Sequence, residues 1–243
     1  MTRRPQVTPR ALVTLSSVLL LVSCTDGAPT PPVRRGADDR RTVADWFDQL
    51  EVSKDAMHRQ AALLGIRDTP FDTLEENLPL LEAKLGHADP ALRVTAAGLL
   101  LRLGERGRAA APRLLKALED DDAFVATTAA QALIALDQHP ASALHTLFQV
   151  TESSADTRLK NVAAKAIYRV ASAPPAVLQL ISEKLRSERH ESRALALLAA
   201  TCLKQRAAPL TAQISPLLED PQPRNRKLAK DALDALAAQG EQP

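Results

Sequence analysis

The chain has 243 residues, of which 45% are apolar, 25% are charged and 2% are aromatic. A chain of this length and apolar content can bury a substantial core, which excludes a wholly disordered protein. The small number of aromatic residues, in a background of Ala and Leu, disfavours a β-sandwich or a β-barrel. The composition therefore predicts an all-helical protein.

The N-terminal segment has the organisation of a secretory signal. Three arginines, Arg3, Arg4 and Arg10, precede an apolar stretch over residues 11–22. This stretch is shorter than the roughly 20 residues that a transmembrane helix needs. Residues 1–23 are therefore predicted to be a signal peptide that is removed from the mature protein.

The sequence Leu21-Val22-Ser23-Cys24 resembles the lipobox of bacterial lipoproteins. The resemblance implies that Cys24 becomes the first mature residue and carries a diacylglyceryl group, with a further acyl chain such as palmitate in many bacteria. Each buried methylene contributes about 0.8 kcal/mol, so two or three chains hold a protein firmly on a membrane. We expect a location in the bacterial cell envelope, on the inner or the outer membrane, with the domain in the periplasm or outside. The alternative is an ordinary secretory signal with a Cys at its cleavage site.

Removal of the signal changes the charge balance of the chain. The full sequence has 31 basic and 29 acidic side chains, and three of the basic ones lie in residues 1–23. The mature chain is therefore slightly acidic and carries no long basic run. Nucleic acid is not an expected partner.

The next two segments differ in composition. Residues 24–41 hold the Cys, several prolines and glycines and a mixed run of Arg and Asp, which is typical of a disordered linker. Residues 42–68 place apolar side chains such as Trp46, Phe47 and Leu50 at helical spacing and predict a helical hairpin. Residues 69–243 form the rest of the fold.

Within residues 69–243 the chain repeats itself about every 33 residues. The repeat can be aligned on apolar anchors spaced 33, 34, 36 and 30 residues apart, each preceded by Ala at the fourth residue before it. The apolar positions around each anchor trace one face of a helix. The anchors are Leu100, Leu133, Ile167, Leu203 and Leu233.

This pattern resembles HEAT repeats of the short bacterial kind that also occurs in phycobilin lyases. The resemblance is clearest in Asp89-Pro90-Ala91-Leu92-Arg93, and weaker versions begin at Asp156 and Asp122. Arg93 and Lys160 are expected to be inter-repeat packing and hydrogen-bond struts and not contacts to a ligand. In this register the fourth copy, residues 192–196, lacks both the Asp and the basic residue. The resemblance implies an all-α, right-handed α-solenoid of about five helical hairpins, preceded by the N-terminal hairpin.

In such a stack the second helices are expected to line a groove. Positions two residues before and after each anchor, together with Tyr168, are expected on the outward face of these helices. They combine cations with an aromatic ring and suit a partner with an acidic, partly apolar segment. These residues could also be solvated surface without a role. The candidate partner-binding residues are Arg102, Gln131, Lys165, Tyr168 and Arg169.

No motif for catalysis stands out. The sequence lacks glycine-rich phosphate loops, a G-x-S-x-G serine and an H-E-x-x-H pair. Its one His-Glu dipeptide, His190-Glu191, contrasts with the four of deoxyhypusine hydroxylase, a HEAT-repeat enzyme that holds iron. We therefore expect no enzyme, no cofactor, no metal and no small-molecule substrate.

The sequence thus predicts a membrane-anchored lipoprotein scaffold that mediates protein–protein interaction at the bacterial cell envelope. The alternative is an enzyme or accessory catalytic subunit, for example a lyase-like HEAT protein, with a site between the N-terminal hairpin and the first repeat. In that case polar side chains would converge near Trp46 and His58.

Overall fold

The computed structural model describes residues 41–238. The predicted signal peptide 1–23, Cys24 and the linker up to residue 40 lie outside the described residues. Residues 41–238 form α-helices and short 3-10 helices without any strand, which confirms the all-helical prediction. Within the same range no helix has the length and apolar character to cross a membrane.

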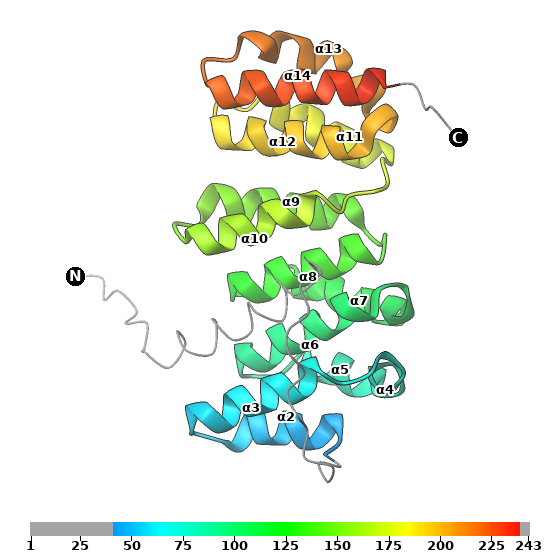
Figure 1. Ribbon diagram of the computed structural model, residues 1–243, viewed down its shortest axis with the longest axis vertical. Coiled ribbons are helices and arrows are strands. Elements are labelled where there is room, and N and C mark those ends of the chain that lie inside the picture. The colour runs from blue at the N-terminus through cyan, green and yellow to red at the C-terminus, as the bar shows by residue number, and fades with distance from the viewer. Residues whose placement is uncertain (1–40, 239–243) are drawn as a thin grey trace, which may run out of the picture. The chain divides into compact units, whose positions relative to one another are not determined.

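The helices follow one another in six pairs over residues 41–238 (Figure 1). The first members of the pairs are α2 (Val43–Val52), α4 (Phe71–Glu76) with α5 (Leu78–Lys84), η1 (Gly104–Ala110) with α7 (Ala111–Ala117), α9 (Pro140–Ser153), α11 (Pro175–Leu185), and α13 (Thr211–Ile214) flanked by η2 (Lys204–Leu210) and η3 (Ser215–Glu219). The second members are α3 (Ala56–Arg67), α6 (Pro90–Leu103), α8 (Ala123–Ala135), α10 (Thr157–Ile167), α12 (His190–Leu203) and α14 (Pro223–Ala237).

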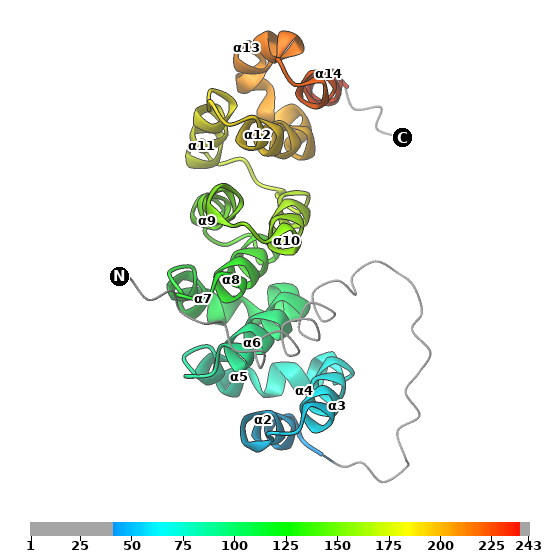
Figure 2. The same ribbon diagram turned by 90° about the vertical axis from the view of Figure 1, so that its left-hand side faces the viewer.

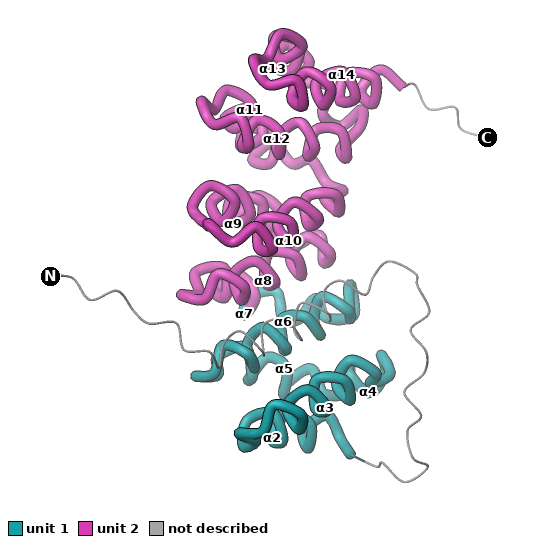
Figure 3. Tube along the Cα trace, turned by 60° about the vertical axis from the view of Figure 1, so that its left-hand side comes forward, with its two compact units in different colours: residues 1–113 teal, residues 114–243 magenta. Residues whose placement is uncertain are grey.

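The chain divides into two compact units, one up to Arg113 and one from Leu114 (Figure 3). In unit 1, α2 packs on α3 and α6, and α4 and α5 pack on α6. In unit 2 the second helices α8, α10, α12 and α14 contact one another in succession, while α9 and α11 form a neighbouring layer (Figure 2). Unit 2 therefore has the two-layered packing of a helical repeat protein.

A polar residue occupies the N-cap position of each second helix and marks the same point in every repeat. Four of these residues are aspartates whose carboxylates accept hydrogen bonds from backbone N–H groups of the first helical turn, which otherwise lack partners. The last two are Arg189 and Gln222. Residues 42–68, predicted as a separate hairpin, thus begin their second helix as the later repeats do. The aspartates are Asp55, Asp89, Asp122 and Asp156.

The predicted register of the fourth copy is wrong by three residues. Because α12 follows Arg189, the residue equivalent to Leu100 of α6 is Ala200 and not Leu203. The copy therefore keeps its basic residue, as Arg193. Residues three apart share one face of a helix, so the apolar pattern alone does not distinguish the two registers.

Arg93 and its equivalents brace the turn between paired helices. The Nη1 atom of Arg93 donates hydrogen bonds to the carbonyls of His87 and Ala88, at 2.8 and 3.0 Å. Arg193 Nη1 makes the same pair of bonds to its own turn, at 2.8 and 2.9 Å. The prediction that Arg93 acts as a hydrogen-bond strut is thus confirmed, and these two bonds lie within its own helix pair, at carbonyls of the turn after α5.

The alanine column of the second helices lies in the core. Ala96, Ala129 and Ala163 are completely buried. Side chains of this size allow neighbouring backbones to approach closely, as stacked repeats require. The buried face predicted from the alanines is therefore confirmed in both units.

Candidate interaction surfaces

Arg102 belongs to the internal bracing of unit 1. From the C-terminal turn of α6 its guanidinium donates hydrogen bonds to the carbonyls of Ile66, at 3.4 Å, and Thr69, at 3.1 Å. It also lies 5.4 Å from the ring centre of Phe71. Burial lowers its pKa. Arg102 therefore fixes the link between α3 and α4, a role that spacing alone did not reveal.

Gln131 does not face outward, so this part of the sequence prediction is wrong. Its side chain is only 5% exposed, and its Nε2 donates a hydrogen bond to the Val162 carbonyl of α10 at 3.3 Å. Its Oε1 is buried without a partner among the described residues. The physical reason is that second helices stand side by side, so this position of α8 meets the next helix and not solvent.

Lys165, Tyr168 and Arg169, which we call the Tyr168 patch, lie together at the C-terminal end of α10. All three are exposed, and the side chain of Tyr168 is 58% exposed. Arg206 lies in η2, which begins the second helix pair after the one that contains α10. Its guanidinium donates a hydrogen bond to the carbonyl of Ala171, two residues after Arg169. The sequence pattern missed Arg206 because it lies outside the second helices. The patch thus combines an exposed aromatic ring with several cations.

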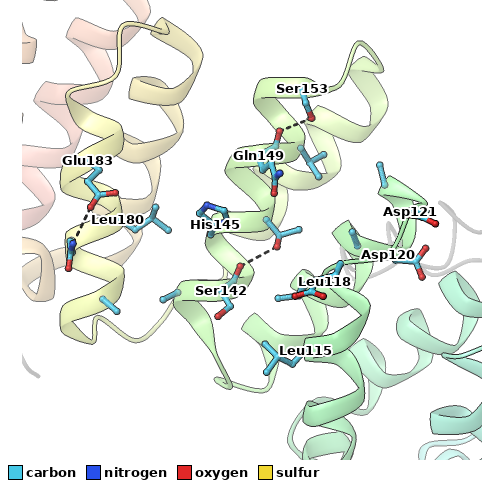
Figure 4. Close-up of a pocket in the computed structure, with 18 residues that line it drawn as sticks. Leu115, Leu118, Asp120, Asp121, Ser142, His145, Gln149, Ser153, Leu180 and Glu183 are labelled. Carbon is cyan, nitrogen blue, oxygen red and sulfur yellow. Dashed lines mark hydrogen bonds between the residues drawn. The ribbon is translucent and has the colours of Figure 1, made fainter. Parts of the chain in front are cut away.

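A groove of about 950 Å³ lies on the other layer of unit 2, among the first helices α7, α9 and α11. Figure 4 shows α9 between the other two, with His145 projecting towards Leu180 of α11 and Leu118 on the opposite side. Sequence analysis did not anticipate it, because its walls come from three repeats and contain no motif. Its lining includes Leu115, Leu118, Glu119, Asp120, Asp121, Ser142, His145, Gln149, Ser153, Leu180 and Glu183.

A second hollow of about 740 Å³ lies beside η3 in unit 2. One wall is Gln213, whose Oε1 is buried without a partner among the described residues. Another wall is the ion pair of Arg193 with Asp220, at 2.6 Å between Nε and Oδ2. These two hollows are thus lined mainly by residues of the first helices and the turns after them, whereas the predicted groove was on the second helices.

Trp46 and His58, which mark the place named for an enzymatic alternative, make separate local contacts. The ring of Trp46 covers Gly65 in α3 and is itself stacked by the Arg41 guanidinium, 4.4 Å from its centre. His58 is exposed, with its Nδ1 3.8 Å from Asp55 Oδ1. Across residues 41–238 no group of three or more His, Cys, Asp or Glu side chains has the arrangement of a metal site. Trp46 thus has a packing role in the first helix pair.

Three solved structures are similar to this chain. Among solved structures, an engineered protein is 18% identical with a TM-score of 0.51, over 82% of this chain and all (100%) of its own. An archaeal HEAT-like repeats protein from Thermococcus onnurineus NA1 is 17% identical over 97% and 98% of the two chains, with a TM-score of 0.46. The complex of CpcE and CpcF of phycocyanin lyase from Nostoc sp. PCC7120 is 19% identical over 65% and 98%, with a TM-score of 0.44.

A search of the curated proteins found no match. The family model for HEAT repeats matches residues 43–135 and 77–168, which together exceed half of the chain. The first of these matches includes the N-terminal pair α2 and α3. By its sequence, its paired helices and their repeated turn, this chain belongs to the HEAT-repeat family.

Proposed function

We propose that the protein is a lipid-anchored scaffold that binds another protein at the bacterial cell envelope. The observation that carries the proposal is the Tyr168 patch, in which Tyr168, 58% exposed, is accompanied by the exposed residues Lys165 and Arg169. Tyrosine and arginine are the side chains in which binding energy most often concentrates at protein interfaces. The proposal assigns no catalytic step to the chain.

The chemistry of the patch favours an acidic, partly apolar segment as its partner. The helix α10 holds three cationic side chains and no carboxylate over Thr157–Ile167. Arg169 and Arg206 add positive charge at its C-terminal end. Carboxylates of a partner would pair with these cations, while the tyrosine ring would cover apolar atoms.

Membrane attachment through Cys24 is the second part of the proposal. Its support is the sequence Leu21-Val22-Ser23-Cys24 after an apolar stretch with a basic start. The substitution Cys24→Ser removes the thiol that would carry the lipid. We expect loss of fatty-acid probe incorporation and an uncleaved or mislocalised precursor. Equal labelling of both chains would contradict the lipoprotein assignment.

The binding function is tested by partner capture from detergent-solubilised membranes. The double variant Tyr168→Ala, Arg169→Ala is expected to weaken capture, since truncation at an interface hot spot costs about 2 kcal/mol or more. The matched control is Met57→Ala, Lys54→Ala, which also removes a large exposed apolar side chain and an exposed cation, but in unit 1. Thermal unfolding of each preparation shows whether a loss of capture is a loss of fold. Unchanged capture by the folded patch variant would overturn the proposal.

A further inference from the structure

The groove among α7, α9 and α11 has a polar floor without Lys, Arg, Asp or Glu. Along α9 the exposed residues Ser142, His145, Gln149 and Ser153 follow one another at helical spacing (Figure 4). These polar side chains are flanked by partly buried leucines, and several alanines line the same groove. The serines and alanines leave room for a bound segment, His145 and Gln149 offer hydrogen-bonding groups, and the leucines offer apolar contact.

The rim of the groove carries negative charge. Glu119 and Asp121 follow α7 and are exposed, and their side chains make no hydrogen bond or ion pair within residues 41–238. Glu183 of α11 only accepts a hydrogen bond from the Gln179 amide, at 3.1 Å. None of the residues lining the groove is Lys or Arg. The rim carboxylates therefore lack a cationic partner from the groove itself.

Other carboxylates at the first helices do have such partners. In unit 2 the carboxylate of Glu152 accepts from Lys184 Nζ at 2.5 Å and from Ser192 Oγ at 2.8 Å. In unit 1 Glu51 pairs in the same way with Lys84 Nζ, at 2.8 Å. These pairs hold consecutive first helices together. Glu119, Asp121 and Glu183 differ, because no lysine or arginine lines the groove beside them.

We propose that this groove binds a protein segment that carries Lys or Arg among apolar residues. The cations of the segment would pair with Glu119, Asp121 and Glu183, and its apolar side chains would contact Leu118 and Leu180. Electrostatic complementarity of this kind selects the partner and speeds association. The groove and the Tyr168 patch have opposite charge and lie on different helices, so the scaffold would hold a basic and an acidic segment at once.

The test uses the full chain and a synthetic peptide of about five helical turns, with leucines at helical spacing and lysines at the other positions. A peptide with glutamates in place of the lysines is the probe control. Fluorescence anisotropy gives the affinity of each peptide. The groove variant is Glu119→Gln, Asp121→Asn, Glu183→Gln. Its matched control is Glu188→Gln, Asp231→Asn, Asp234→Asn, which removes the same charge from exposed positions outside the groove.

We expect the lysine peptide to bind the wild-type chain and the control variant with equal affinity. Its affinity for the groove variant should be about tenfold lower, and its affinity for the wild-type chain should fall as the salt concentration rises. The substitution Ser142→Arg, on the exposed floor, should also weaken binding. Tyr168→Ala with Arg169→Ala should leave it unchanged, which separates this proposal from the one above. Equal loss in the groove and control variants, no binding of the lysine peptide, or tighter binding of the glutamate peptide would each overturn it.

Discussion

Arg193 and Asp220 form a two-point ion pair that ties α12 to the turn before α14. Arg193 Nε lies 2.6 Å from Asp220 Oδ2, and Nη2 lies 3.1 Å from Oδ1. The Asp220 side chain is 1% exposed and also accepts a hydrogen bond from the Gln222 N–H at 2.8 Å. The hydrogen bond from Arg193 is the main cause that lowers the pKa of Asp220 to about 2.

This pair predicts a loss of stability in acid. The pKa of Asp220 is lower in the folded chain than the value of about 3.9 typical of unfolded chains, so its contribution is complete above pH 4 and is lost as the pH falls towards 2. At neutral pH Asp220→Asn should cost about 3 kcal/mol, because it leaves the guanidinium of Arg193, whose side chain is only 13% exposed, without its counter-charge. The difference between wild type and variant should shrink below pH 4. Urea unfolding at several pH values measures it, and a difference that stays constant down to pH 3 would contradict the assignment.

Substitution by alanine should change stability in opposite directions at two helical glycines, Gly65 and Gly98. A Cβ on Gly65 would lie 2.3 Å from Cε2 of Trp46, whereas a Cβ on Gly98 would meet nothing within 4 Å. Gly65→Ala should destabilise the chain by about 1–3 kcal/mol through overpacking. Gly98→Ala should stabilise it by about 0.5–1 kcal/mol, because alanine loses less entropy in a helix. Thermal unfolding followed by circular dichroism compares them, and a higher midpoint for Gly65→Ala would show that Trp46 does not pack as described.

Lys204 adopts a backbone conformation that suits glycine. Its φ and ψ are 51° and −134°, nearly those of Gly104 at the equivalent point after α6, 54° and −136°. Side chains other than glycine rarely adopt this region, and strain of this kind costs about 1–3 kcal/mol. Lys204→Gly should therefore raise the unfolding midpoint by an amount equivalent to about 1 kcal/mol. Its neighbour provides the control, since Gln205→Gly relieves no such strain; a lower midpoint for Lys204→Gly would contradict the prediction.

The sequence was sufficient to predict the helical repeat and several of the residues that begin its second helices. Asp89, Asp122 and Asp156 mark the starts of second helices because a carboxylate there satisfies free backbone N–H groups. Such caps act within a few residues and are visible in the sequence. The register of the fourth copy could not be read in this way, because Arg189 occupies the position at which the earlier copies have Asp.

The interaction surfaces were harder to predict, because they depend on which helix faces which. Gln131 and Lys165 occupy the same position relative to their anchors, yet Gln131 is buried against α10 and Lys165 is exposed. The groove of α7, α9 and α11 gathers residues that lie far apart in the sequence. Periodicity describes one helix at a time and so could not locate either feature.

The proposal that the Tyr168 patch binds a partner protein at the membrane is tested most directly by photo-crosslinking from position 168 in living cells. A photoreactive phenylalanine analogue replaces Tyr168 in one strain and Glu188, an exposed residue outside the patch, in another. We predict a protein adduct from position 168 and none from position 188, with the adduct lost in the Cys24→Ser chain, because an anchored scaffold meets its partner only at the membrane. An absence of any adduct at position 168, or equal adducts from both positions, would contradict the account.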